Sequence, residues 1–244
     1  MEFMLAPSES SSQRITFKKA AKEAFQYLKN PRYSVEDNAF TLGQKVHYCF
    51  QIYLLQLVFL PFLVPLIYVA KKMTQAEHLE IDQKNWAVVL YIILLGPLLE
   101  ELVFRGLLRF NRKVIAFWGS LLLGGLGWVL SPNSTFKNAS VYMVFMSFPV
   151  FYIATEYVKT TLHEFWKNHF KVVFHFVAVS FALIHLGNFT NIHNYLWALP
   201  LVSIQLILGY FLGFLRIKFG FWYGVGLHIM WNFTFTIISL LDNS

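Results

Sequence analysis

The sequence predicts an all-α membrane protein, a polytopic bundle of transmembrane helices with seven spans, or eight if one span is broken. The first observation is composition: 57% of the residues are hydrophobic and 14% are charged, whereas soluble domains carry roughly 25% charged residues. The second is a series of apolar runs, each near the roughly 20 residues that cross a bilayer. The third is a net charge of +7 located in juxtamembrane loops, which favours membrane lipid, and not nucleic acid, as the partner of the basic residues.

Residues 1–45 are predicted as a cytoplasmic N-terminal segment, because Lys and Arg gather in the loops that are cytoplasmic when the N-terminus is inside. Residues 1–13 are rich in serine and are expected to be disordered. Residues 15–29 place apolar side chains roughly on one side and lysines elsewhere. This pattern predicts an amphipathic helix on the membrane surface, with a solvated helix as the alternative. Residues 46–241 are predicted to form one helical domain in the membrane.

Apolar runs long enough to cross the bilayer follow the N-terminal segment. The first contains Pro61 and Pro65 and the sixth contains Pro200, which predicts a kink or break in both. Small residues recur four apart, as in Gly209 and Gly213, which predicts close helix packing. The seven runs cover approximately 46–70, 86–108, 114–130, 140–158, 172–189, 194–215 and 221–241.

The stretch from Leu98 to Phe110 places two carboxylates and a guanidinium at the end of the second run. Ionisable residues at membrane depth are costly and mark functional sites. Glu101 and Arg105 are four residues apart, so they share a helix face and are expected to form an ion pair. Glu100 lies about 100° further round the helix, which leaves it for chemistry. The alternative is a charged helix end that reaches the lipid headgroups.

Two further runs carry polar residues at membrane depth. The fifth places Phe181 and His185 on one face, and the seventh does the same with His228 and Asn232. Either histidine alone could be a buried residue that is hydrogen-bonded to a neighbouring helix. At 1.5 Å per residue, however, both histidines and Glu100 lie about 10 to 20 Å from the cytoplasmic ends of their spans. They are therefore expected to meet in one cavity.

A carboxylate, two imidazoles and an amide around a water-filled cavity suit the hydrolysis of an amide bond. A buried glutamate is a good general base for water, and histidine and asparagine donors can stabilise the oxyanion of a tetrahedral intermediate. No serine or cysteine in these motifs is placed as a nucleophile. Activation of water is therefore expected in place of covalent catalysis.

Three motifs in this order resemble the signature of the CAAX protease and bacteriocin-processing family of intramembrane proteases, also called the Abi family. They are EExxxR at 100–105, FxxxH at 181–185 and HxxxN at 228–232. The resemblance covers about residues 86–241. It implies an intramembrane endopeptidase whose substrate is a peptide or protein, which in the eukaryotic and archaeal branch is a prenylated C-terminal CaaX tail.

The resemblance also implies roles for single residues. Glu100 and His185 match the pair that activates water, and His228 and Asn232 match the pair that stabilises the oxyanion. By the same resemblance, Glu101 and Arg105 match a supporting ion pair, and Phe181 matches an aromatic residue beside the histidine.

The cofactor and two other functions stay open. Glu100, His185 and His228 are the motif residues that could bind zinc, which needs three protein ligands at a catalytic site. No HExxH motif is present, and resemblance to the glutamate-type members implies a metal-free site with zinc as the alternative. The main alternative function is a non-proteolytic scaffold or immunity protein that binds a peptide or lipidated tail. The other is a proton-coupled transporter, for which no inverted repeat is evident.

Overall fold

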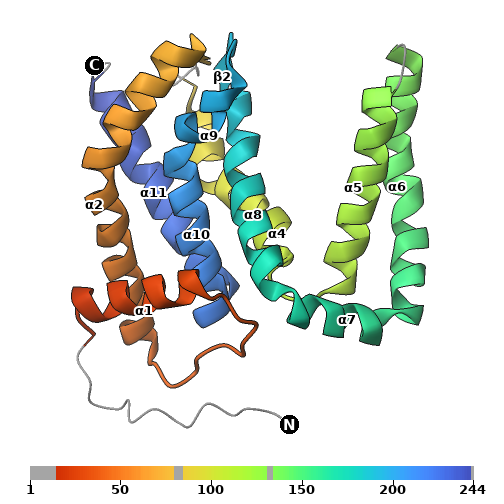
Figure 1. Cartoon of the computed structure of the whole chain (residues 1–244), viewed down its shortest axis with the longest axis horizontal. Coiled ribbons are helices and arrows are strands. Elements are labelled where there is room, and N and C mark those ends of the chain that lie inside the picture. The colour runs from red at the N-terminus through yellow and green to blue at the C-terminus, as the bar shows by residue number, and fades with distance from the viewer. Residues whose placement is uncertain (1–14, 80–84, 131–133, 243–244) are drawn as a thin grey trace.

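The computed structural model describes residues 15–79, 85–130 and 134–242, and these parts of the chain form a bundle of helices (Figure 1). Within them, five helical segments are long and apolar enough to cross a membrane. Two bent pairs of helices raise the number of spans to seven when each pair is counted as one span. The predicted all-α transmembrane bundle is confirmed, and its count of seven spans agrees with this upper number.

The elements run in the following order along the chain. They are α1 (Phe17–Lys29), α2 (Leu42–Thr74), β1 (Glu77–His78), α3 (Trp86–Leu90), the π-helical turn η1 (Tyr91–Leu95), α4 (Gly96–Gly106), α5 (Arg112–Leu130), α6 (Ser134–Tyr157), α7 (Lys159–Asn168), α8 (Phe170–Ile184), the 3₁₀ turns η2 (His185–Asn188) and η3 (Tyr195–Trp197) with β2 (Phe189–Thr190) between them, α9 (Ala198–Leu201), α10 (Ser203–Lys218) and α11 (Phe221–Asp242).

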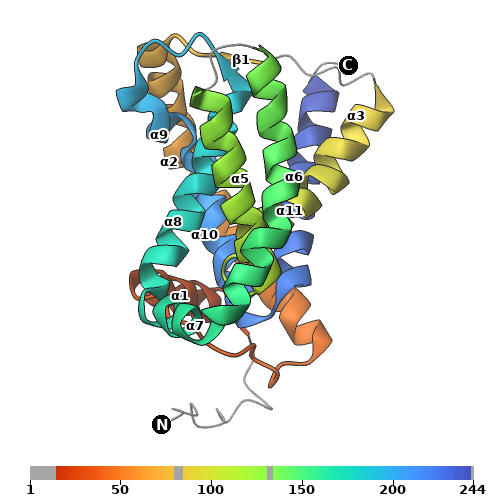
Figure 2. The ribbon, with the colours of Figure 1, turned by 90° about the vertical axis from the view of Figure 1, so that its right-hand side faces the viewer.

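Helix α1 confirms the helix predicted in the N-terminal segment. Its first turn is capped by Thr16, whose hydroxyl accepts a hydrogen bond from the backbone N–H of Lys19 at 3.3 Å, as N-cap residues do. Ala20 and Ala24 are fully buried against the bundle. Helices α1 and α7 both lie across the same end of the bundle, at a steep angle to the long helices (Figures 1 and 2). The placement of α1 on a membrane surface stays a prediction.

Helix α10 lies in the centre of the bundle, with α2, α8 and α11 packed around it (Figure 1). Two glycines allow the close approach of α8. A Cβ atom at Gly209 would lie 3.0 Å from the ring of Phe181, and one at Gly213 would lie 3.0 Å from the ring of Phe174. The close packing predicted from small residues four apart is therefore confirmed for this pair.

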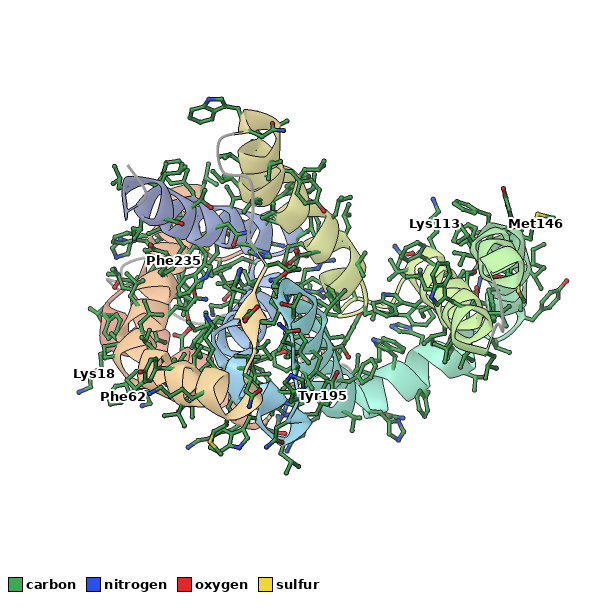
Figure 3. The ribbon with its side chains drawn as sticks, turned by 90° about the horizontal axis from the view of Figure 1, so that it is seen from above. Lys18, Phe62, Lys113, Met146, Tyr195 and Phe235 are labelled. Carbon is green, nitrogen blue, oxygen red and sulfur yellow. The ribbon has the colours of Figure 1, made fainter. Side chains whose placement is uncertain are left out.

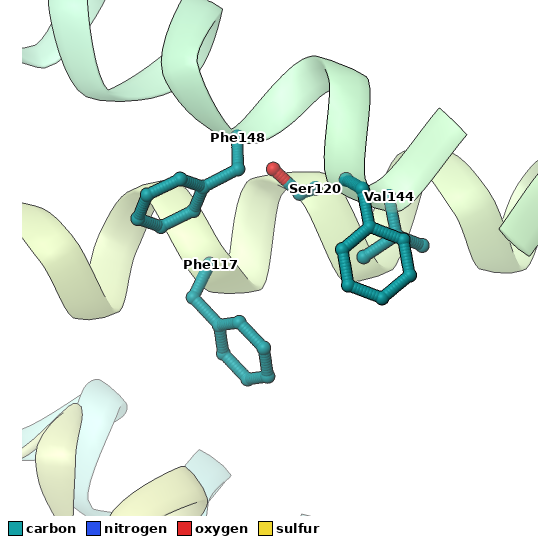
Figure 4. Close-up of a pocket in the computed structure, with 5 residues that line it drawn as sticks. Phe117, Ser120, Val144 and Phe148 are labelled. Atoms are coloured by element: carbon teal, nitrogen blue, oxygen red, sulfur yellow. The ribbon is translucent and has the colours of Figure 1, made fainter. Parts of the chain in front are cut away.

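Helices α5 and α6 pack along each other and stand beside the main bundle (Figures 1 and 3). The indole N–H of Trp118 on α5 donates to the carbonyl of Val103 on α4 at 2.9 Å, which attaches this hairpin to the bundle. A pocket lies between the two helices (Figure 4), and no residue of the three sequence motifs lines it. Its lining residues are Phe117, Ser120, Val144, Phe145 and Phe148.

The two proline-containing runs behave differently. The sixth is broken, because the segment Tyr195–Leu201 and α10 meet at an angle of 52°. The first is one helix, since Pro61 and Pro65 both lie inside α2, so the break predicted there is not found. Both prolines face outward, where a missing backbone hydrogen bond and a bulky ring disturb no neighbouring helix.

Two short features were not predicted from the sequence. Strands β1 and β2 pair in antiparallel fashion, with Glu77 opposite Thr190, at the end of the bundle opposite α1 and α7 (Figure 1). Gln75 and Asn191 beside them adopt φ angles of 59° and 58°, which terminate α2 and turn the chain after β2. The predicted disorder of residues 1–13 lies outside the described residues.

Candidate active site

The helix that carries Glu100 contains a π-helical turn about two turns before it. The N–H of Gly96 donates to the carbonyl of Tyr91, five residues back, and Pro97 has no N–H to donate. The carbonyl of Ile92 would accept a hydrogen bond from Gly96 in an α-helix and from residue 97 in a π-helix. It therefore receives a backbone hydrogen bond from neither residue. Turns of this kind often occur at functional sites.

Asn232 on α11 satisfies that carbonyl. Its side-chain amide nitrogen donates to the oxygen of Ile92 at 2.9 Å. One of the two N–H groups of the amide is thus used to hold α11 against the π-helical turn, and the second N–H and the amide oxygen are not used by this bond. The structure therefore directs this hydrogen bond of Asn232 to the backbone and not to another of the predicted site residues.

A buried ion pair lies next to Glu100. The Nε atom of Arg105 is 3.2 Å from Oε2 of Glu101, and both side chains are at most 1% exposed. The other carboxylate oxygen, Oε1, accepts a hydrogen bond from Nδ1 of His228 at 3.1 Å. Gly224 on α11 allows this approach, because a Cβ there would lie 3.3 Å from Oε2 of Glu101. Glu101 therefore links the cation on α4 to the imidazole on α11.

Glu100 faces two imidazoles. Its Oε2 atom is 3.6 Å from Nε2 of His185 and 3.8 Å from Nε2 of His228. These distances exceed a direct hydrogen bond. His185 donates from Nδ1 to the carbonyl of Phe181 at 2.7 Å, and His228 uses Nδ1 on Glu101, so both rings turn Nε2 toward the same carboxylate. A proton or a water molecule can be shared among these three groups.

The ring of Phe181 lies under this cluster. It contacts the imidazoles of His185 and His228 edge to face, at centroid distances of 4.8 and 5.7 Å. The guanidinium of Arg105 lies 4.0 Å from the centre of the same ring and donates to the carbonyl of Gly209 at 3.4 Å. One fully buried aromatic side chain thus holds two imidazoles and a cation in place.

The structure brings six of the seven predicted residues into one connected cluster, from α4, α8, its 3₁₀ extension and α11. The seventh residue, Asn232, contacts the π-helical turn that precedes α4. Sequence reasoning missed the turn itself, although the pair Gly96–Pro97 inside an apolar run was its signal. The small residues four apart predicted close helix packing, but not that Gly209 admits the ring of Phe181 or that Gly224 admits the carboxylate of Glu101.

Glu100, His185 and His228 are the motif residues that the sequence offered as zinc ligands. Within the residues that the structure describes, no group of three or more His, Cys, Asp or Glu side chains has the arrangement of a metal site. The cofactor requirement therefore stays a prediction, to be decided by experiment.

Comparison with known proteins provides one match. A family model described as type II CAAX prenyl endopeptidase Rce1-like matches residues 82–234, a range that contains all seven candidate residues. No curated protein and no solved structure matches the chain.

Proposed function

This chain belongs to the Rce1-like family of type II CAAX prenyl endopeptidases, and we propose that it hydrolyses a peptide bond with water activated by Glu100 and His185. One observation carries the proposal most directly. Oε2 of Glu100 lies 3.6 and 3.8 Å from the Nε2 atoms of two imidazoles. A carboxylate and an imidazole at this separation can contact the same water molecule, and the water then lies within reach of a general base.

The reaction needs a base, an oxyanion site and a proton for the leaving amine. Glu100 removes a proton from water while the water oxygen attacks the carbonyl carbon of the peptide. His185 accepts the second hydrogen bond of that water through Nε2, because its Nδ1–H is used on the carbonyl of Phe181. When the C–N bond breaks, the proton held by Glu100 passes to the leaving nitrogen. Each atom of water thus ends in one of the two products.

The oxyanion of the tetrahedral intermediate is assigned to His228 and Asn232. In this role Nε2 of His228 carries a proton, and Asn232 donates the N–H that Ile92 does not use. Preorganised donors of this kind lower the barrier most when they do not have to move during the reaction. The bonds of His228 to Glu101 and of Asn232 to Ile92 support such preorganisation.

Glu101 and Arg105 serve the site without touching substrate in this proposal. With protons on both ring nitrogens His228 is a cation, and its charge and that of Arg105 are balanced by the two carboxylates of Glu100 and Glu101. The proposed mechanism uses no metal ion or other cofactor.

The substrate in this proposal is a protein tail anchored to the membrane by a prenyl group on a C-terminal CaaX cysteine. An apolar anchor concentrates such a tail at the bilayer, where the site lies. We place the N-terminus in the cytoplasm, with α1 and α7 on that face, because the positively charged loops follow this orientation.

The test is hydrolysis of a peptide that ends in a farnesylated CaaX sequence by the purified protein in lipid nanodiscs, with the unmodified peptide as the matched control. We expect release of the last three residues from the farnesylated peptide, and one ¹⁸O atom from labelled water in the new carboxylate. A folded protein that binds the farnesylated peptide but releases no product contradicts the proposal and favours a scaffold.

A further inference from the structure

The segment between α1 and α2, residues 31–41, lies along the ends of helices that carry the candidate site. We call residues 31–41 the strap. Its start is fixed by Tyr27, whose hydroxyl donates to the carbonyl of Arg32 at 3.0 Å; burial raises the pKa of Tyr27, so the hydroxyl keeps its proton. Its end is fixed by Phe40, whose ring packs against Tyr48 and Phe219.

Between these ends the strap contacts three helical regions of the bundle, two of which carry candidate site residues. The carbonyl of Ser34 accepts a hydrogen bond of 2.5 Å from Arg109, in the turn that follows α4. The ring of Tyr33 contacts Phe170 at the start of α8. The N–H of Asp37 donates to the carbonyl of Lys218 at the end of α10, at 2.7 Å. The strap therefore connects helices that do not follow one another along the chain.

Glu36 is the charged centre of the strap. Its Oε1 atom lies between two guanidinium groups, 3.5 Å from Nη1 of Arg216 and 3.9 Å from Nη2 of Arg109. The carboxylate also lies over Gly220, where a Cβ would come within 2.9 Å of Oε2. Gly220 has a φ angle of 106°, which glycine adopts without strain, at the turn from α10 into α11. The carboxylate of Glu36 thus contacts both guanidinium groups and the turn at Gly220.

A chain of polar contacts runs from Glu36 to the candidate site. Arg216 donates from Nε to the carbonyl of Arg105 at 3.4 Å. The side chain of Arg105 pairs with Glu101 at 3.2 Å, and Glu101 accepts from His228 at 3.1 Å. Each member of this chain touches the next, and its last member faces Glu100.

We propose that Glu36 is a positioning residue for the active site. It acts through Arg216, which holds the α4 backbone at Arg105 and thereby the register of Glu100 and Glu101 against α11. The inference rests on the proposed function. It assigns a catalytic contribution to a segment outside residues 82–234, the range that the family model matches.

The stability contribution of this contact is expected to be small. The side chain of Glu36 is 38% exposed and that of Arg216 is 15% exposed, and ion pairs near water contribute little to folding. Catalysis, in contrast, responds steeply to misplacement of reacting groups by about 1 Å. The inference therefore predicts an effect on kcat that exceeds any effect on the melting temperature.

The experiment compares Glu36→Gln with Glu23→Gln in the full-length protein. Glu23 is a matched control, since it forms an ion pair with Lys218 on the same face at 3.1 Å and does not touch Arg216. We expect Glu36→Gln to lower kcat about 10- to 100-fold, with KM and melting temperature unchanged, and Glu23→Gln to retain wild-type kcat. Equal kcat in the two variants overturns the inference.

A double-mutant cycle tests whether Glu36 acts through Arg216. Arg216→Lys keeps the charge but lacks the fork that contacts Glu36 and the Arg105 carbonyl together. Both changes break the same chain of contacts. We therefore expect the kcat of the double variant to be no lower than the kcat of the less active single variant. Losses that multiply contradict the proposed route.

Amide hydrogen exchange tests, independently of activity, whether Glu36 holds α4 in position. Glu36→Gln is expected to speed exchange in α4 relative to both wild type and Glu23→Gln, and unchanged exchange overturns the inference. An inactive wild type with faster exchange in Glu36→Gln contradicts the proposed function alone. An active wild type with unaltered kcat in Glu36→Gln contradicts the positioning role alone.

Discussion

The side chain of Asn232 replaces the hydrogen bond that the π-helical turn denies to the carbonyl of Ile92. The N–H of Gly96 goes to Tyr91 and Pro97 has none, so the amide of Asn232 supplies the donor at 2.9 Å. The last motif residue is thereby tied to the helix that carries the first motif. Asn232 has a structural role in the bundle besides the oxyanion role proposed for it.

Replacement of Asn232 by Leu should therefore destabilise the protein as well as inactivate it. A fully buried carbonyl left without a partner costs about 1–3 kcal/mol, and because the bond to Ile92 is partly buried we expect a loss at the lower end of that range. The matched background is Pro97→Ala, which restores a backbone N–H near the carbonyl of Ile92. We expect the loss of unfolding free energy caused by Asn232→Leu to shrink in that background. An equal loss in both backgrounds, measured by denaturation in detergent, contradicts the assigned bond.

Glu101→Gln should affect folding more than a typical charge removal does. Arg105 has no exposed surface, and removal of one partner of a buried ion pair costs about 3–5 kcal/mol. Glu164→Gln is the matched control, because its partner Lys167 lies on the surface, where such pairs contribute about 0–1 kcal/mol. Thermal unfolding of the two variants beside wild type measures the difference. Similar melting temperatures would show that Arg105 is stabilised by other groups.

Gly209→Ala should disturb the aromatic platform under the two imidazoles. The new Cβ would lie 3.0 Å from the ring of Phe181 and 3.3 Å from the carbonyl of Ala178. Overpacking of this kind costs about 1–3 kcal/mol, and displacement of Phe181 moves His185 and His228 with it. Peptide hydrolysis is expected to fall about 10- to 100-fold.

The control for that substitution is Gly226→Ala, because a Cβ at Gly226 meets nothing within 4 Å. In a helix interior alanine is favoured over glycine by roughly 1 kcal/mol. Gly226→Ala should thus be neutral or stabilising with full activity. Equal activity of Gly209→Ala and Gly226→Ala would mean that Phe181 does not position the histidines.

Removal of metal ions should leave hydrolysis intact. The proposed mechanism uses a carboxylate and two imidazoles without a Lewis acid, so a strong chelator has no essential ion to remove. The measurement is the initial rate of peptide hydrolysis before and after dialysis against the chelator. A rate that is abolished by the chelator and restored by zinc would establish the zinc alternative, which uses water bound to the metal.

The parts of the site that follow from helical periodicity could be predicted from the sequence. Glu101 and Arg105, and likewise Phe181 and His185, are four residues apart, and contacts at this spacing depend only on local helix geometry. The same geometry separated Glu100 from the ion pair. These residues do lie together in the structure as their spacing predicts.

The contacts between helices could not be predicted in the same way. The bond from His228 to Glu101 joins residues 127 apart in sequence, and that from Asn232 to Ile92 joins residues 140 apart. Periodicity does not specify which helices become neighbours or at what height they meet. Glu36 was missed for the same reason, since nothing local indicates that residues 31–41 return to the end of α10.

The most direct test of the account is the effect of Glu100→Gln on kcat for a farnesylated CaaX peptide, measured beside wild type at equal amounts of folded protein. The substitution keeps the size of the side chain and removes its ability to take a proton from water. Because the side chain of Glu100 is 33% exposed, we expect no loss of melting temperature, and a decrease in kcat of at least about 10²-fold. A Glu100→Gln protein that hydrolyses the peptide at the wild-type rate would contradict the assignment of Glu100 as the base that activates water.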